Sequence, residues 1–314
     1  MNNMEIISNV LGINLLDNKI IAFTTNKNIN KTLDFVSVVV SSYYRSKSRE
    51  TCLIYQETKS SYVYMLTMTL ELIKFDGDFS IFDAFELKDG FAVVCKQTRT
   101  YHLLSPKHGN IDLGFYFRFS GLKIDNFLFD RNTNEIFIYS LKEKKIINKY
   151  NLSKEFNIEE NIINGINSID DKLIILLSDG SIIAINVNSG QLLWKFERIG
   201  RFEIYKNVIY SVSDQYINVI DINTGDIIQR SGIEDLELNY NFIATGEHKV
   251  YDQYLFIMNA GMPGRIVVIQ RGTLKFDQII EIEGMIPIGK NNLYFLNSKL
   301  YVLNNLNTMY IYNL

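Results

Sequence analysis

The sequence predicts an all-β protein that folds as a single β-propeller, and three observations indicate this fold. Short apolar runs rich in Ile, Val and Tyr alternate with turn residues along the chain, a pattern that favours strands over helices. One such unit recurs with an offset of about 35 residues, a period typical of propellers and other repeat proteins. Only 3 of the 314 residues are Pro, whereas Phe and Tyr number 20 and 19. That composition also favours sheet.

The two clearest copies of the unit occupy residues 165–232. In the first copy, Asp179-Gly180 and Asn188-Ser189-Gly190 separate apolar runs, and such sequences form hairpin turns because Gly and Asn tolerate positive φ. The second copy repeats the last turn as Asn223-Thr224-Gly225. Four strands in such a unit make one blade of a propeller. For the first copy we expect strands at 165–169, 173–177, 182–187 and 191–196.

The repeated unit resembles the PQQ-like repeat of quinoprotein-type β-propellers. Asp179-Gly180, Ala184-Ile185-Asn186, Ser189-Gly190 and Trp194 carry the resemblance in the first copy. The second copy keeps Val219-Ile220-Asp221 and Thr224-Gly225 but has Gln229 in place of the Trp. The resemblance covers roughly residues 165–230. It implies the propeller fold, and it does not imply bound quinone, because many such propellers bind none.

The rest of the chain divides into further units with the same strand pattern. Residues 1–75 are the least regular and are interpreted as one blade with a long hairpin, with two blades as the alternative. Residues 285–314 are expected to form the closing blade. The predicted strands outside the two clear copies are 19–25, 33–40, 51–55, 62–69, 79–87, 91–95, 100–104, 111–117, 127–129, 135–139, 146–152, 236–244, 250–258, 265–270, 274–282, 285–288, 293–296, 300–303 and 309–312.

No Pro/Gly/Ser-rich linker or block of charge divides the chain, so residues 1–314 are predicted to form one domain. The number of units favours seven four-stranded blades, with eight as the alternative. Pairing of the first blade with the last removes free sheet edges. The strand-like C-terminus is therefore expected to be buried in the ring.

Composition and charge argue against several classes of protein. The formal net charge is −3, which does not indicate binding to nucleic acid or to an anionic membrane. No apolar run reaches the roughly 18 residues of a membrane-spanning helix, and the N-terminus does not read as a secretory signal. We therefore expect a cytoplasmic protein. Cys52 and Cys95 lie in apolar runs and are expected to be buried thiols.

The candidate chemical motifs are weak. Residues 284–291 approach a phosphate-binding loop, but Asn291 replaces the required hydroxyl and a strand-like run follows. His102, His108 and His248 have no recognised metal-ligand spacing. Trp194 matches the position that packs against the next blade. The sequence thus predicts no catalytic residue, no metal and no cofactor.

Two groups of residues are candidate partner-binding sites. The first is a basic, aromatic segment expected to be a hairpin loop. The first interpretation is an ordinary solvated loop; a protein interface, which Tyr and Arg suit, comes second, and stacking and pairing with nucleic acid comes third. The second lies on the face that carries the middle hairpins and the connections between blades. It leans acidic, which could steer a basic partner. The candidates are Tyr43, Tyr44, Arg45, Lys47 and Arg49 in the loop, and Asp179, Arg201, Asp214, Glu234, Asp235 and Met262 on the face.

These observations favour a non-catalytic propeller that binds another protein. A narrower hypothesis is a cytoplasmic immunity protein that neutralises a toxin by covering it. An enzyme of hydrolase, lyase or quinoprotein type, with a site at the central channel, is one alternative. A scaffold in envelope assembly is another.

Overall fold

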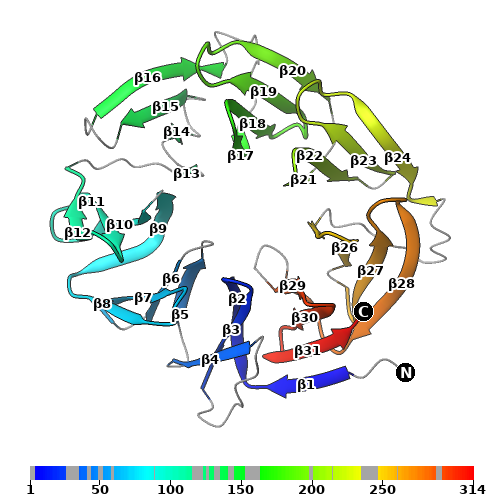
Figure 1. Cartoon of the computed structure of the whole chain (residues 1–314), viewed down its shortest axis with the longest axis horizontal. Coiled ribbons are helices and arrows are strands. Elements are labelled where there is room, and N and C mark those ends of the chain that lie inside the picture. Colours follow the sequence, from blue (N-terminus) through cyan, green and yellow to red (C-terminus); the bar gives the residue numbers. More distant parts are fainter. Residues whose placement is uncertain are drawn as a thin grey trace.

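The computed structural model describes residues 4–25, 35–40, 44–48, 52–57, 60–87, 89–114, 123–124, 127–130, 135–140, 145–152, 163–197, 201–213, 215–234, 247–259, 261–287 and 292–314. The strands of these residues form eight separate sheets, seven with four strands and one with three. Figure 1 shows the sheets arranged side by side around a ring. In the clearest sheets the first strand lies nearest the centre and the last strand on the outer rim.

Each sheet is built mainly from consecutive strands. The first four are β2 (Val10–Leu16), β3 (Lys19–Thr24) and β4 (Phe35–Val39); β5 (Tyr44–Ser48), β6 (Cys52–Glu57), β7 (Val63–Thr67) and β8 (Leu72–Phe75); β9 (Phe79–Leu87), β10 (Gly90–Cys95), β11 (Tyr101–Ser105) and β12 (Gly109–Asp112); and β13 (Lys123–Ile124), β14 (Phe127–Asp130), β15 (Glu135–Ser140) and β16 (Lys145–Asn151). The last four are β17 (Ile163–Ile169), β18 (Lys172–Leu177), β19 (Ile182–Asn186) and β20 (Leu192–Phe196); β21 (Arg201–Tyr205), β22 (Val208–Val212), β23 (Tyr216–Asp221) and β24 (Ile227–Gly232); β25 (Glu247–Val250), β26 (Tyr254–Asn259), β27 (Gly264–Gln270) and β28 (Lys275–Ile282); and β29 (Leu293–Leu296), β30 (Lys299–Leu303) and β31 (Thr308–Asn313) with β1 (Met4–Ser8).

The hydrophobic core lies between neighbouring sheets rather than at one centre. In β18, Leu173, Ile174 and Ile175 are all fully buried, because a middle strand is covered on both of its faces. One cluster joins sheet β17–β20 to sheet β21–β24, and another joins β21–β24 to β25–β28. Middle strands therefore read as continuous apolar runs, which is why their positions were predictable from the sequence.

Trp194 packs against the neighbouring sheet, as its place in the repeat predicts. Its ring N–H donates a hydrogen bond to the carbonyl oxygen of Ile222 at 3.0 Å, and its side chain is buried. The ring lies so close to Gly225 that a Cβ there would come within 2.8 Å of it. Tyr150 makes the same contact one sheet earlier, with its hydroxyl on the carbonyl of Val187. The repeated turn glycine thus leaves room for an aromatic ring of the preceding sheet.

The first and last strands of the chain pair, as ring closure requires. β1 runs antiparallel to β31, with Met4 opposite Tyr312 and Ser8 opposite Thr308. β31 also pairs with β30, and its residues Met309, Tyr310 and Ile311 are buried. The expected burial of the C-terminal strand is therefore confirmed.

The structure differs from the sequence prediction near both ends. Residues 10–75 supply two separate sheets, β2–β4 and β5–β8, which agrees with the alternative of two units and not with one unit that has a long hairpin. Residues 285–287 form no strand, and the predicted strand at 285–288 is wrong as far as it is described. The fourth strand of that sheet is β1, from the opposite end of the chain. The predicted strand at 236–244 lies outside the described residues.

Candidate functional site

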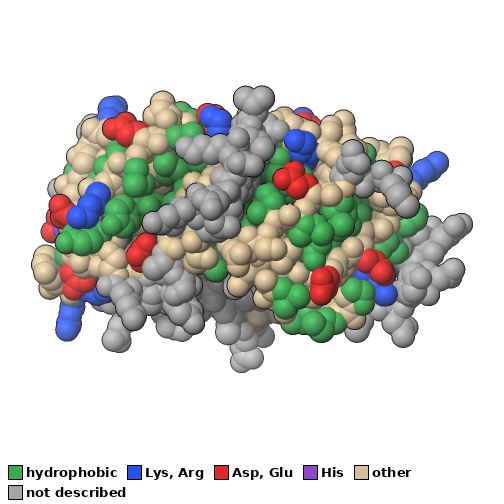
Figure 2. All heavy atoms as spheres, turned by 90° about the horizontal axis from the view of Figure 1, so that it is seen from below, with side chains coloured by type: hydrophobic (Ala, Val, Ile, Leu, Met, Phe, Trp, Pro, Cys, Tyr) green, Lys and Arg blue, Asp and Glu red, His purple; other side chains and the backbone are tan. Residues whose placement is uncertain are grey.

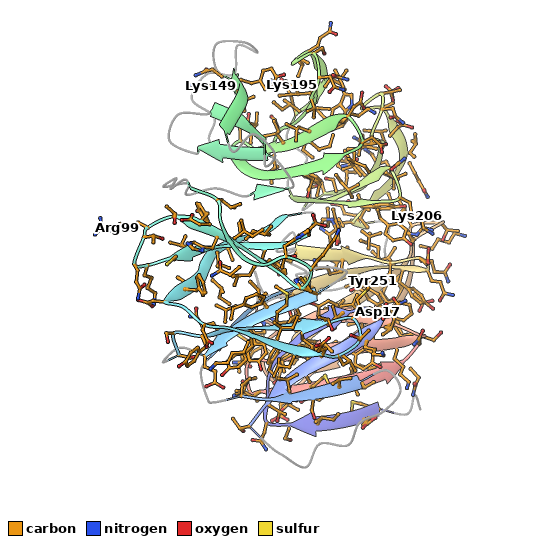
Figure 3. All side chains as sticks on the ribbon, turned by 60° about the vertical axis from the view of Figure 1, so that its left-hand side comes forward. Asp17, Arg99, Lys149, Lys195, Lys206 and Tyr251 are labelled. Carbon is orange, nitrogen blue, oxygen red and sulfur yellow. The ribbon has the colours of Figure 1, made fainter. Side chains whose placement is uncertain are left out.

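The antiparallel order of the strands assigns each turn to one of two faces of the ring. In a four-stranded sheet, the turn between the second and third strands emerges on the same face as the connection to the next sheet. We call this the connection face. Figure 3 shows Arg99, from the turn between β10 and β11, on one side of the ring, and Asp17, Lys206 and Tyr251, from turns between first and second strands, on the other.

Three of the predicted face residues are described with their side chains, and all three are exposed on the connection face. Asp179 lies in the turn between β18 and β19, where its carboxylate accepts a hydrogen bond from the backbone N–H of Ser181 at 2.8 Å. Glu234 follows β24. Met262 lies between β26 and β27 with 69% of its surface exposed. Arg201 begins β21, and Asp214 and Asp235 lie outside the described residues.

The described part of the basic, aromatic segment, residues 44–48, is a strand rather than the expected hairpin loop. Tyr44, Arg45 and Lys47 belong to strand β5, which pairs along its length with β6. The polar sequence of this segment favoured a loop. Pairing with the apolar strand β6 makes it a strand instead. Tyr43 and Arg49 lie outside the described residues.

Three exposed apolar residues, Met262, Met285 and Leu306, lie on segments that contact one another, and we call this group the apolar patch. Met285 is 39% and Leu306 53% exposed. Hydrogen bonds connect the three segments. The N–H of Gly264 donates to the carbonyl oxygen of Gly284 at 2.6 Å, and the N–H of Met285 donates to the side-chain oxygen of Asn305 at 2.9 Å. The apolar patch therefore lies where sheet β25–β28 meets the sheet of β29, β30, β31 and β1.

Gly284 allows this close approach. Its φ is +77°, and a Cβ there would come within 2.6 Å of the side-chain oxygen of Asn305 and 3.2 Å of Leu306. A glycine is required at such a crowded position with positive φ. The same glycine begins the near-match to a phosphate-binding loop, and β29, not a helix, follows that segment.

The border of the apolar patch carries negative charge. Glu283 is exposed and forms no ion pair with any residue that the structure describes. Nearby, the Arg265 guanidinium donates to the Glu281 carboxylate at 2.8 Å, so these two charges offset each other. Met262 was among the predicted residues, whereas Met285 and Leu306 were missed. Leu306 lies in the turn between β30 and β31, and an apolar residue in a turn was the sequence signal that could have identified it. Met285 lies after β28, in a segment that the sequence predicted to be a strand.

The opposite face carries a polar cluster that connects two sheets. The Asp252 carboxylate accepts hydrogen bonds from the Tyr205 hydroxyl and the Lys206 ammonium, and the Lys206 hydrogen bond lowers the pKa of Asp252. Arg271 donates from Nε to the Asp252 carbonyl at 2.8 Å and from Nη1 to the Tyr210 hydroxyl at 3.0 Å. Each of these groups has a partner within the cluster, which indicates that the cluster stabilises the contact between sheets β21–β24 and β25–β28.

The histidines and cysteines do not form a metal site in the described part of the chain, where no group of three or more potential ligands occurs. His102 hydrogen-bonds Asn110 at 2.8 Å, and the buried His248 lies 3.0 Å from the carbonyl oxygen of Tyr210. Cys52 and Cys95 are buried thiols, as expected, and no disulfide joins them. No helix among the described residues is long and apolar enough to span a bilayer.

Comparison with solved structures supports the propeller architecture. BamB from Moraxella catarrhalis, a PQQ-like β-propeller, is 12% identical with a TM-score of 0.53, over 84% of this chain and 82% of that one. The computationally designed Ika8 protein is 12% identical with a TM-score of 0.61, over 98% and 96% of the two chains. No family model and no curated protein matches the sequence. The chain has an all-β fold with a distant resemblance to β-propellers.

Proposed function

We propose that this protein is a non-catalytic β-propeller that binds another protein through its connection face. The observation that carries the proposal is the apolar patch of Met262, Met285 and Leu306, whose side chains are 69%, 39% and 53% exposed. Exposed apolar groups that gather at one place mark interaction sites more often than single exposed residues do. Methionine suits such a surface because its flexible side chain adapts to the shape of a partner.

The negative border of the apolar patch favours a partner with basic side chains around an apolar centre. Glu283 borders the patch, and Glu234 and Asp179 add negative charge on the same face. Opposite charge at the rim of an interface speeds association and orients the partner. Binding is therefore expected to weaken at high salt.

A comparison of single variants tests the proposal. Tagged protein is incubated with a lysate of the source cells, and bound proteins are identified by mass spectrometry. Met262→Ser and Leu306→Ser should lose a stoichiometric partner that the wild type retains. Met68→Ser is the matched control, because Met68 is 42% exposed in a turn on the opposite face. The absence of such a partner, or equal loss with all three variants, would refute the proposal.

The narrower proposal is a cytoplasmic immunity protein whose partner is a toxin. The acidic tendency of the connection face supports it, because such a face suits a basic target. The test is co-expression with the protein encoded by the neighbouring gene. Rescue of growth that depends on Met262 is the expected result, and growth inhibition that this chain does not relieve would contradict it.

We further propose that each of the eight sheets is one blade. The distribution of the core between neighbouring sheets supports this count over seven. An experimental structure of the full ring would test it directly.

A further inference from the structure

Polar side chains interrupt the apolar contact between sheets β17–β20 and β21–β24. Ser211, Asn218 and Arg230 occupy opposite positions on the neighbouring strands β22, β23 and β24, so their side chains lie on one face of the sheet. Ile220, two residues after Asn218, shares this face and belongs to the apolar cluster that joins the two sheets. The polar row therefore lies in the same contact, with Ser211 and Asn218 buried and Arg230 exposed on the outer strand.

Uncharged groups hold the guanidinium of Arg230 in place. Its Nε–H donates a hydrogen bond to Oδ1 of Asn218 at 2.7 Å. Its central carbon lies 4.9 Å from the centre of the Tyr216 ring, and 41% of the surface of Tyr216 is exposed. These two contacts orient the guanidinium at the outer rim of the ring, where Figure 1 shows strand β24.

The other side-chain donors of this group have no acceptor in the described part of the chain. There, neither Nη atom of Arg230 takes part in a hydrogen bond or an ion pair, and Nδ2 of Asn218 donates no hydrogen bond. The amide is the more informative of the two, because Asn218 is only 4% exposed. A buried donor without an acceptor is unfavourable, and in a native protein it indicates a partner from outside the chain, such as water, an ion or a ligand.

Arg230 also has no acidic neighbour of the kind that two other described arginines have. Arg265 forms an ion pair with Glu281 at 2.8 Å, and Arg271 lies in the cluster around Asp252. Figure 2 shows the same tendency on one side of the rim, where most basic side chains lie beside acidic ones. Arg230 thus carries a positive charge that no described carboxylate offsets.

We propose that Tyr216, Asn218 and Arg230 form a binding site for a carboxylate group, which we call the carboxylate site. Because Nε is occupied, the two Nη atoms form the free edge of the guanidinium, and their parallel N–H groups match the two oxygens of a carboxylate. Nδ2 of Asn218 supplies a further donor. A carboxylate carries one negative charge, which the single Arg230 offsets, whereas a phosphate monoester carries about −1.5 to −2.

The carboxylate has two possible sources, a free organic acid and an acidic side chain of another protein, and both reach the site from the rim. Tyr and Arg are residue types that often contribute most to the affinity of protein interfaces, and a guanidinium that is already oriented loses less conformational freedom on binding. The inference does not rest on the proposed function. The carboxylate site lies between sheets β17–β20 and β21–β24, whereas the apolar patch lies where sheet β25–β28 meets the last sheet.

An NMR titration that follows the assigned side-chain amide signal of Asn218 tests the inference. Acetate and N-acetylglutamate α-amide should both shift this signal saturably. N-acetylglutamine α-amide, which lacks the carboxylate, and sodium chloride at equal ionic strength should not. Tighter binding of the glutamate derivative than of acetate would identify an acidic side chain as the source of the carboxylate, and equal or weaker binding would identify a free acid.

Two conservative variants locate the binding. Arg230→Lys keeps the positive charge but loses the paired N–H groups, and it should raise the dissociation constant of acetate about fivefold. Arg265→Lys is the matched control, because Arg265 already has a carboxylate partner in Glu281, and it should leave this constant unchanged. Unchanged circular dichroism should show that both variants are folded.

The absence of a saturable shift with either carboxylate would overturn the inference. So would an equal shift with N-acetylglutamine α-amide, tighter binding of inorganic phosphate than of acetate, or equal weakening by Arg230→Lys and Arg265→Lys.

Discussion

Gly225 shows how a single residue couples two sheets. Its φ is +77°, and the ring of Trp194 occupies the space that a side chain would need. Gly225→Ala should therefore lower the free energy of unfolding by about 1 to 3 kcal/mol through backbone strain and overpacking. Urea denaturation provides the measurement. Gly109→Ala is the control, since Gly109 has a similar φ of +69° but no atom near its missing Cβ, and an equal cost at both sites would contradict the role of Trp194.

The raised pKa of Tyr55 makes the stability of the protein depend on pH in the alkaline range. It lies in β6 with its ring stacked on Tyr64 at 5.1 Å and edge-on to Phe23 at 5.4 Å. Burial raises the pKa of Tyr55 to about 12, and Tyr64 adds to this shift. The pKa of Tyr55 in the folded protein exceeds the value near 10 of an unfolded tyrosine. Between about pH 10 and 12 the folded state therefore binds more protons than the unfolded state does. The stabilisation is complete below about pH 10 and is lost as the pH rises toward 12.

Tyr55→Phe should reduce this loss of stability between about pH 10 and 12. The thermal midpoint followed by circular dichroism at several pH values measures it. Tyr62→Phe is the control, because it removes the same hydroxyl group from an exposed tyrosine. A steep alkaline loss that is identical in Tyr55→Phe and the wild type would exclude Tyr55 as a cause.

At the scale of elements, one turn chemistry recurs in three sheets. Asp221 accepts hydrogen bonds from the backbone N–H groups of Asn223 and Thr224, at 2.7 and 3.2 Å. Asn186 does the same for Asn188 and Ser189 in the preceding sheet. Asn304 accepts from Leu306 and Thr308. An acceptor one residue ahead of the turn fixes these hairpins.

Asp221→Ala should destabilise the protein by about 1 kcal/mol, because it removes the acceptor of two backbone N–H groups. Asp221→Asn should cost much less, because Asn186 already performs this role in the neighbouring turn. Chemical denaturation of the two variants compares them. Equal destabilisation would indicate that the negative charge, rather than the hydrogen bonds, supports the turn.

The elements differ in how far the sequence predicts them. The middle strands β18, β22 and β26 were predicted because their apolar runs are continuous and turn residues bound them. Strand β5 was missed because Tyr44, Arg45 and Lys47 carry no apolar alternation, and only pairing with β6 makes them a strand. In the apolar patch only Met262 was predicted. Met285 was placed in a strand that the structure does not contain, and Leu306 was overlooked although it is an apolar residue in a turn.

At the scale of the whole molecule, closure joins the two ends of the chain. The sequence indicated that first and last units must pair, and it could not indicate that β1 alone crosses to the last sheet. β1 has only five residues, so its alternation of apolar and polar side chains is too short to indicate which strand it pairs with, 300 residues further along the chain. Closing the ring requires only that no sheet edge remains unpaired, and any strand that pairs with β31 meets this requirement.

The two closing strands should respond differently to truncation. β31 lies between β30 and β1 and buries Met309, Tyr310 and Ile311, so a chain ending at residue 307 should fail to fold. β1 lies at the outer edge, with Met4 and Ile6 about half exposed, so a chain beginning at residue 9 should fold with a lower thermal midpoint. A peptide with the sequence of residues 4–8, fused by a flexible linker to the C-terminus of the shortened chain, should restore the midpoint. Full stability of the shortened chain without the peptide would show that pairing of β1 with β31 does not hold the ring closed.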